Sequence, residues 1–213
     1  MDKFIMKKIL LCLLLALSIS GYAQVSWNVK AGANLSKETN SNVDMKLGYQ
    51  LGVGMDYYFN EHWGIQSSLT LITKGYKSKG NYYYPAEWNS DLSKYDKTEN
   101  RIYLGLPIAL AYKFRISNNF KLVFHGGGYM SYGIGGKYKN KVIAKDNTSD
   151  TYKYNTFSSY SGTEKFDVGL SAGTTLEYLN KYTVGVIGEW GLKRTLATDT
   201  RNHTYGINIG YKF

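Results

Sequence analysis

The chain has 213 residues, in which 26 Lys and Arg outnumber 16 Asp and Glu and give a net charge of +10. Its one cysteine, Cys12, excludes an internal disulfide and a zinc site built from several thiolates. A content of 21 Tyr and 23 Gly beside only 2 Pro favours a protein made of strands, and the positive charge favours anionic partners.

The N-terminal segment has the three parts of a secretory signal peptide. Residues 1–8 contain three lysines, residues 9–19 are almost entirely apolar, and residues 20–23 include the small residues that precede a cleavage site. The apolar run is too short to span a bilayer as a helix. We therefore predict cleavage before Gln24, with an uncleaved anchor as the alternative. Cleavage removes three Lys, one Asp and Cys12, which leaves a mature chain without thiols and with a net charge of +8.

After Gln24, apolar residues alternate with polar residues or glycine in eight segments. A period of two is typical of a strand with one apolar face. About ten residues of such a strand are enough to cross a bilayer at a tilt. The segments are 25–35, 47–59, 63–71, 102–114, 120–130, 166–178, 182–192 and 203–213.

The links between these segments are alternately short and long. The short links are 60–62, 115–119 and 179–181, and the long links are 36–46, 73–100, 133–165 and 193–202. Short turns at one end and long loops at the other are typical of outer-membrane barrels, whereas a soluble sandwich has no reason to sort its loops in this way. We therefore predict an all-β fold, a closed eight-stranded antiparallel transmembrane β-barrel.

Aromatic residues gather at the ends of the segments that the short links join. All of them fall on the apolar phase of their own strand, as expected where Trp and Tyr meet lipid headgroups. A soluble barrel with an inward apolar face, which is the alternative, has no need of aromatic residues at one rim. The predicted girdle consists of Trp27, Tyr57, Phe59, Trp63, Tyr112, Phe114, Phe120, Tyr178, Tyr182, Tyr211 and Phe213.

Three residues fit the strand pattern poorly. Pro107 lies in mid-strand, where it removes a ladder hydrogen bond, and a closed barrel has no free edge to hold it. We expect a bulge or a local break there. Ile72 and Ile187 are apolar residues on the inward phase, which indicates either bulges or contacts inside the barrel.

The last segment, HTYGINIGYKF, alternates up to a final aromatic residue. With the signal peptide and the eight alternating segments, it makes the chain resemble the small outer-membrane β-barrels of the OmpX and OmpA type. The Tyr and Lys content resembles the PorT-like barrels of Bacteroidota. The resemblance implies a signal peptide over 1–23, a barrel domain over 24–213 in the bacterial outer membrane, and both termini in the periplasm. It also implies that Tyr211 and Phe213 belong to the signal read by the barrel assembly machinery.

The phase opposite the apolar face points into the barrel and carries many ionisable residues. The interior of an eight-stranded barrel is just wide enough for side chains, and buried charges have to be paired. We therefore expect a plug of ion pairs, with a narrow polar pathway as the alternative because many inward positions are glycine. The predicted interior network is Lys30, Asp56, Arg101, Lys113, Lys121, His125, Lys165, Asp167, Glu177, Glu189 and Lys212.

No motif in the chain indicates an enzyme, a metal site or a cofactor. His62 falls in a short link, His125 in the interior and His203 at the outer rim on the lipid phase, and none has a catalytic partner beside it. No two His have the spacing of metal ligands, and the glycines at 126–128 lie within a strand rather than in a phosphate-binding turn. We expect no nucleic acid partner, since the nearest polyanion to a surface barrel is lipopolysaccharide.

Aromatic residues are also frequent in the two longest links. Exposed Tyr and Trp are over-represented at recognition surfaces, so we predict recognition by these loops; the alternative is that the strands simply extend beyond the membrane and pack there. The candidate recognition residues are Tyr82, Tyr83, Tyr84, Trp88, Tyr152 and Tyr154.

The sequence thus predicts a non-enzymatic outer-membrane barrel that acts as a surface-binding or envelope-structural protein through its long Tyr-rich loops. The expected partners are outer-membrane lipid and lipopolysaccharide, the assembly machinery, and an extracellular or envelope protein. The alternatives are a narrow transport pathway, a secretion-apparatus accessory of the PorT-like kind and, less favoured, a lipid-modifying enzyme acting through His203.

Overall fold

The computed structural model describes residues 24–39, 43–82, 93–144, 147–158, 163–193 and 200–213; the predicted signal peptide lies outside them. In these ranges no helix is long and apolar enough to cross a bilayer. The strands are β1 (Gln24–Glu38), β2 (Asp44–Tyr58), β3 (Trp63–Tyr82), β4 (Ser93–Arg115), β5 (Phe120–Ile143), β6 (Ser149–Asn155), β7 (Phe166–Tyr178), β8 (Tyr182–Gly191) and β9 (Asn202–Lys212).

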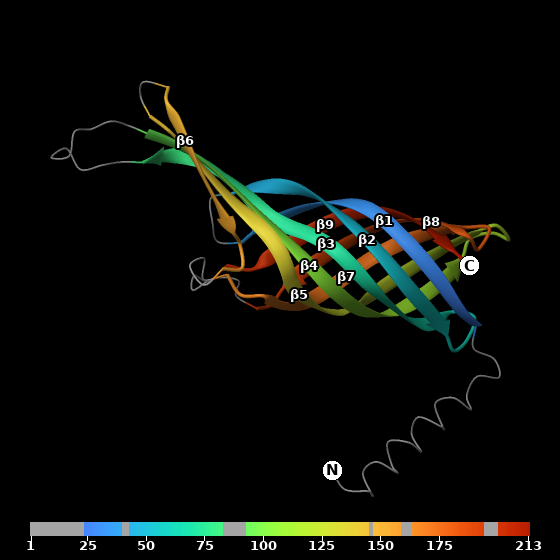
Figure 1. The fold of residues 1–213 in the computed structure, drawn as a ribbon. Helices are drawn as coiled ribbons and strands as arrows, with labels where there is room; N and C mark the ends of the chain where they lie inside the picture. The colour runs from blue at the N-terminus through green and yellow to red at the C-terminus, as the bar shows by residue number, and fades with distance from the viewer. Residues whose placement is uncertain (1–23, 40–42, 83–92, 145–146, 159–162, 194–199) are drawn as a thin grey trace, which may run out of the picture.

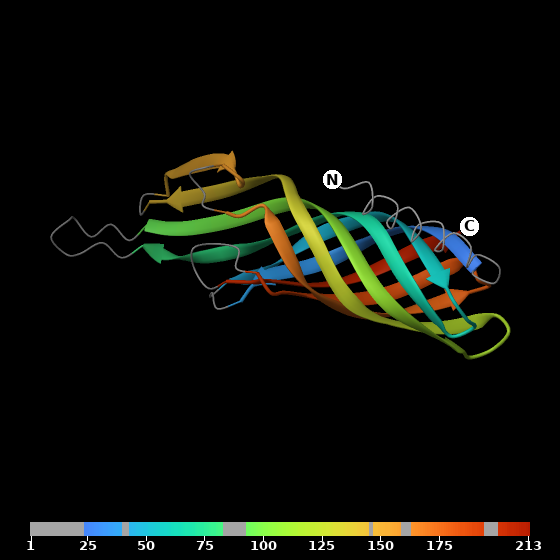
Figure 2. The same ribbon diagram turned by 90° about the horizontal axis from the view of Figure 1, so that it is seen from below.

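Eight of these strands form a closed antiparallel ring (Figures 1 and 2). Going round the ring, the order is β1, β2, β3, β4, β5, β7, β8 and β9, and the pairing of β1 with β9 closes it. β6 stands outside the ring and pairs with the upper part of β5, beyond the stretch of β5 that pairs with β7. The predicted closed eight-stranded barrel is confirmed.

The two ends of the barrel differ in their connections. At one end lie the turns after Tyr58, Arg115 and Tyr178, together with the start of β1 and the end of β9; we call this the short-turn end. The other end carries the longer connections and is called the long-hairpin end. Both ends of the barrel domain therefore lie on one side of the ring (Figure 1).

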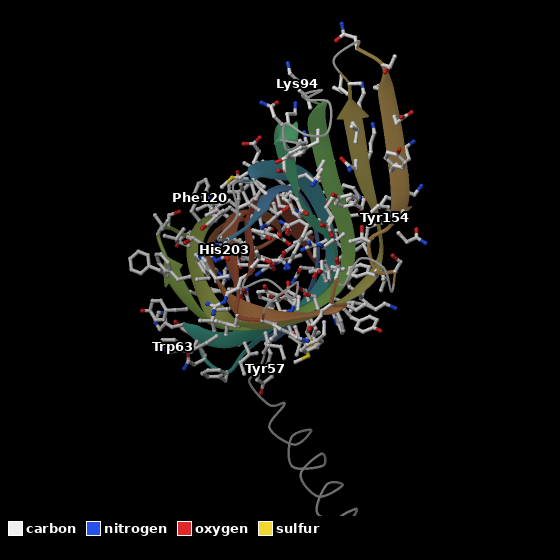
Figure 3. The ribbon with its side chains drawn as sticks, turned by 90° about the vertical axis from the view of Figure 1, so that its left-hand side faces the viewer. Tyr57, Trp63, Lys94, Phe120, Tyr154 and His203 are labelled. Carbon is white, nitrogen blue, oxygen red and sulfur yellow. The ribbon has the colours of Figure 1, made fainter. Side chains whose placement is uncertain are left out.

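Alternation along the strands separates an apolar wall from a polar lumen. Outward residues such as Leu51, Val184 and Ile207 are more than half exposed. Asn28, Asp56 and other inward polar residues are buried. Figure 3 looks along the barrel and shows nitrogen and oxygen atoms gathered within the ring, with the labelled Tyr57, Trp63 and Phe120 on its outer side.

The predicted aromatic girdle surrounds the short-turn end, and a second belt lies near the other end. In the first belt, Trp63 packs edge-on against Tyr112, with ring centroids 4.9 Å apart. The second belt was not predicted. On β7, Phe166 and Tyr178 belong to different belts, and their separation along the chain corresponds to about 30 Å across the membrane for a tilted strand. This is close to the height of a bilayer core. The second belt consists of Tyr49, Tyr132, Phe166, Trp190 and Tyr205.

The long links 73–100 and 133–165, expected as loops, are mostly strand. β3 and β4 pair continuously out to Tyr82 and Ser93, and β5 continues to Ile143, where β6 pairs with it. The outer parts of β3, β4 and β5 together with β6 form a four-stranded sheet that rises above the ring, here called the projecting sheet (Figure 1). Backbone pairing in the projecting sheet continues the barrel's own ladders, so these segments need no separate core.

The expected irregularity at Pro107 is a break without a bulge. Pairing of β3 with β4 is interrupted beside Pro107, but the register is the same on both sides of the gap. The Ser67 hydroxyl donates to the Pro107 carbonyl at 3.1 Å and replaces part of the missing ladder. Pairing continues without a shift through Ile187, and Ile72 and Ile187 both line the lumen. The bulges lie elsewhere, in β2 between Met45 and Gln50 and in β5 opposite Ile102.

Candidate functional site

Arg101 is the centre of a buried ion network in the lumen near the long-hairpin end. Its guanidinium contacts the Glu99 carboxylate at 2.7 Å and the Glu38 carboxylate at 2.5 Å. It also donates to the side-chain oxygen of Asn202 at 3.1 Å. Arg101 is fully buried, so these contacts replace the water that an exposed guanidinium would keep.

Lys74 extends this network to the other side of the ring. Its ammonium lies 3.1 Å from the Asp167 carboxylate and 2.9 Å from that of Glu189. Asp167 also accepts hydrogen bonds from the Asn202 amide at 3.1 Å and from the Tyr129 hydroxyl at 3.3 Å. Because Asn202 accepts from Arg101 and donates to Asp167, the two halves form one unit, here called the Arg101 network. It includes residues from every strand of the ring except β2.

A second cluster, the Lys212 network, crosses the lumen near the short-turn end. The Lys212 ammonium contacts the Asp56 carboxylate at 2.6 Å and also pairs with Glu177. Asn28 donates to Asp56 at 3.1 Å. All four side chains are buried.

Between the networks the lumen holds a cavity of about 70 Å³, lined in part by Ile72, His125 and Glu189. This space is enough for a few water molecules. Neighbouring side chains fill the space left by inward glycines. A Cβ at Gly169 would lie 2.7 Å from the Tyr129 ring, and one at Gly173 would lie 2.6 Å from the His125 ring. The lumen geometry therefore fits the plug better than the polar pathway.

In the part of the chain that the structure describes, the predicted interior residues comprise residues in ion pairs, residues on the inward phase without an ion pair, and Lys165, which lies outside the lumen. Ion pairs join Asp56, Arg101, Asp167, Glu177, Glu189 and Lys212 within the networks. Lys30, Lys113, Lys121 and His125 lie on the inward phase without an ion pair among the described residues. The Lys113 ammonium instead lies 3.5 Å from the centre of the Tyr58 ring, and His125 Nε2 lies 3.4 Å from the Thr175 hydroxyl.

Lys165 was placed in the interior incorrectly. It precedes β7, which begins at Phe166, so the strand alternation does not extend to it. Its side chain is exposed and lies 6.0 Å from the ring of Tyr132, which belongs to the outer wall.

Three charged residues of the Arg101 network were not predicted: Glu38, Lys74 and Glu99. All three were assigned to long loops, although each lies on a strand. The alternation offered a usable signal, since Glu99 and Arg101 are two residues apart and therefore share a face. This signal could be used only on the assumption that the strands continue beyond their apolar segments.

Within the described parts of the chain, no hydrogen bond joins His62, His125 or His203 to an acid that could orient a catalytic imidazole. His62 Nδ1 lies 3.1 Å from the Lys113 carbonyl oxygen, and its ring stacks on Tyr112. His203 stands opposite Lys37 on β1 and Trp190 on β8, and neither residue is an acid that could orient an imidazole. The described residues contain no group of three or more His, Cys, Asp or Glu that could hold a metal ion.

The projecting sheet has a face rich in tyrosine. The register aligns Tyr76, Glu99, Tyr138 and Tyr154 across β3, β4, β5 and β6, and Tyr152 follows on the same face of β6. The Tyr138 and Tyr154 rings stack with centroids 4.7 Å apart, and Tyr152 and Tyr154 remain 57% and 45% exposed. These residues, together with Tyr95, form what we call the tyrosine face. It continues the lumen-facing phase, because Tyr76 lies beside Arg101.

Of the other candidate recognition residues, Tyr82 is the last residue of β3, and Tyr83, Tyr84 and Trp88 lie outside the described residues. Phe157, after β6, turns back to the lumen. Its ring packs edge-on against Tyr103 at 5.7 Å, and the adjacent Thr156 is completely buried. Phe157 is therefore a packing residue.

Comparison with protein families identifies the chain. The outer membrane protein beta-barrel domain family matches residues 16–197. The chain belongs to this family, whose members are β-barrels of the bacterial outer membrane. A comparison with curated proteins gives no match for this barrel.

Solved structures similar to this barrel include the attachment invasion locus protein Ail of Yersinia pestis, with 15% identity, 89% of this chain and 99% of that chain covered, and a TM-score of 0.44. The Neisserial surface protein NspA is 11% identical to this chain, and the match covers 90% of this chain and 99% of NspA with a TM-score of 0.40. The outer membrane enzyme PagL is 11% identical to this chain, and the match covers 85% of this chain and 97% of PagL with a TM-score of 0.42.

We predict that Arg101→Met lowers the free energy of unfolding of this barrel by about 3–5 kcal/mol, because it takes the buried guanidinium away from the two carboxylates that it contacts. Urea unfolding in lipid vesicles measures the change. Adding Glu38→Gln and Glu99→Gln should recover part of the loss. As the control, Lys79→Gln breaks an exposed pair with Asp96 and should cost no more than about 1 kcal/mol. Equal losses for Arg101→Met and Lys79→Gln would contradict the role given to the network.

We also predict no steady ion conductance when this barrel is inserted into a planar bilayer, because both networks cross the lumen. Single-channel recording measures it. A steady conductance whose ion preference changes in Glu189→Gln would restore the transport alternative, since Glu189 lines the central cavity.

Proposed function

We propose that this barrel is a non-enzymatic binding protein of the outer membrane, and that the tyrosine face of the projecting sheet recognises a protein partner outside the cell. The observation that carries the proposal is the height and composition of the sheet. A membrane anchor alone needs strands only as long as the bilayer is thick, whereas β4 and β5 have 23 and 24 residues.

Tyr152 and Tyr154 supply the contact area. A tyrosine presents a large amphipathic ring while losing little conformational entropy, which is why tyrosines are frequent in binding surfaces. Here the stacking of Tyr154 on Tyr138 holds one ring in place before a partner arrives. Preorganisation of this kind raises affinity.

The outer edge of β6 supplies a second mode of contact. All seven residues of β6 are exposed, and β5 is its only strand neighbour among the described residues. The backbone groups on its other edge are therefore available to an extended segment of a partner, which would add a strand to the sheet. The tyrosines beside this edge would then select the partner's side chains.

A lipid-modifying activity fits less well. His203 is on the lipid phase, as such a base would have to be, but its strand neighbours are Lys37 and Trp190. A cation beside the imidazole disfavours its protonated form, which hydrolysis has to pass through.

The proposal places the long-hairpin end outside the cell and the short-turn end, with both termini, in the periplasm. A cysteine introduced at Ser149 should react with a membrane-impermeant maleimide on intact cells, because Ser149 is exposed at the start of β6. A cysteine introduced at Asn118, in a short turn, should react only after permeabilisation. The mature chain has no other thiol, so the unmodified protein is the control. The reverse pattern of labelling would refute this orientation.

We predict that Tyr152→Ala with Tyr154→Ala abolishes capture of the protein partner, with a loss of affinity of about 30-fold or more, as for two central tyrosines of an interface. The purified barrel, held in mild detergent, is used to pull down proteins from the medium in which the cells grow, and the amount of captured partner is compared between variants. The matched control is Thr151→Ala with Asn155→Ala, which changes the opposite face of β6 and should retain the partner. A partner held equally by both double variants would move recognition away from the tyrosine face.

A further inference from the structure

The face of the projecting sheet opposite the tyrosines is rich in lysine. The register places Lys77, Thr98, Lys139 and Lys153 in one row across β3 to β6, and Lys79, Asp96, Lys141 and Thr151 in the next. This face continues the outward phase of the barrel wall. We define the lysine face by six side chains: Lys77, Lys79, Lys137, Lys139, Lys141 and Lys153.

The bulge in β5 turns three of these lysines outward. Below it, odd-numbered residues such as Tyr129 face the lumen, and Lys137, Lys139 and Lys141 would do the same if the phase continued. At the bulge, Tyr103 pairs with Gly133 but Ile102 pairs with Gly135, so one residue is added and the phase reverses. Gly136 follows with φ +157°, and a Cβ there would lie 2.2 Å from the Asn100 carbonyl oxygen, so the close approach requires glycine.

The charge on the lysine face is only partly compensated, by Asp96 opposite Lys79 and by Asp44 opposite Lys77. Within the described residues, the one ion pair on it joins Lys79 to Asp96 at 3.4 Å. Lys139 and Lys153 stand directly opposite each other on adjacent strands, an arrangement that is unfavourable without an anion between them. Five of the six lysines are exposed, and the sixth, Lys141, is half-buried. A bound polyanion would relieve this repulsion.

The height of the lysine face on the barrel indicates which polyanion it can reach. On β5, Tyr132 belongs to the second aromatic belt, and Lys137 lies five residues further from the barrel centre. Five residues of a tilted strand correspond to a rise of about 12 Å, just above the headgroup boundary. Because the face continues the lipid-facing wall, it looks out over the membrane surface.

We propose that the lysine face binds the phosphate groups of lipopolysaccharide in the outer leaflet around the barrel. This inference rests on the proposed orientation, which puts the long-hairpin end outside the cell. Lysine ammonium groups on flexible stems suit phosphates spread over a saccharide, since each acts as a point charge without a fixed geometry. The sheet spaces them regularly, about 5 Å apart between strands and about 7 Å apart along a strand. One protein thereby presents tyrosines to a protein partner and lysines to its own membrane.

The test compares charge on the lysine face with equal charge elsewhere. The variant Lys137→Gln with Lys139→Gln and Lys141→Gln removes three lysines of the face. The control Lys97→Gln with Arg115→Gln and Lys181→Gln removes three positive charges that lie off it, Lys97 on the tyrosine face and the other two at the short-turn end. Each full-length mature protein, in neutral detergent micelles, is titrated with purified lipopolysaccharide and with the same material after removal of its phosphates.

We expect the face variant to bind intact lipopolysaccharide about 10- to 100-fold more weakly than the unmodified protein at physiological salt, as three lysines near an anionic surface imply. The control variant should stay within about threefold, and dephosphorylated material should bind all three proteins weakly. Equal weakening of both variants would overturn the proposal in favour of net charge alone. Equal binding of both lipopolysaccharide forms would overturn it as well.

Further measurements test the choice of partner, the integrity of the fold and the orientation of the barrel separately. A soluble sulfated oligosaccharide that binds the face more tightly than lipopolysaccharide does would overturn the choice of partner. Unfolding temperatures of the three proteins should agree, which excludes loss of fold as the cause. If the Ser149→Cys variant is not labelled on intact cells, the orientation fails and both proposals fail with it. If it is labelled and the face variant binds normally, the lysine face alone is refuted.

Discussion

In the hydrocarbon core of a bilayer, a backbone N–H or C=O finds a hydrogen-bond partner only within the protein. The pairing of β1 with β9 meets this requirement by closing the ring, which leaves no open strand edge in the lipid. Closure with eight strands also makes the lumen narrow. The inward side chains are then removed from water as well as from lipid, so their charges need partners inside the protein.

The two networks provide those partners by joining strands that are not neighbours. Arg101 on β4 reaches Glu38 on β1, and Lys212 on β9 reaches Glu177 on β7 and Asp56 on β2. The hydrogen-bonded ladders fix each strand only to the next one, whereas these contacts span the ring at two levels. The wall can therefore support strands that continue well beyond the bilayer, and the projecting sheet with its tyrosine and lysine faces is built on those strands.

The alternation of residue types was sufficient to predict all eight strands of the ring and their inward and outward faces, because lipid and lumen impose opposite polarity on successive residues. The ends of strands were less predictable. Once β3 and β4 leave the membrane, neither face has to be apolar, so Lys74 and Glu99 were assigned to loops. The bulge near Ile134 has no clear sequence signal, since the glycines around it also suit an ordinary strand or a turn. Which charges pair across the lumen depends on the register of distant strands, which no local pattern specifies.

The networks also bear on how the chain folds. Asn202 and Lys212, at the two ends of β9, each complete one network, and Glu38 and Asn28 contribute from β1. Until the first and last strands meet, Asp56, Glu177 and Asp167 lack contacts that they need once buried. An open, partly assembled barrel is therefore penalised in its interior as well as at its unpaired edges. The pairing of β1 with β9 and the neutralisation of the lumen charges therefore occur in a single cooperative step. A nascent barrel whose last strand is missing or out of register keeps carboxylates without these partners in its lumen, and this destabilises it relative to the closed barrel.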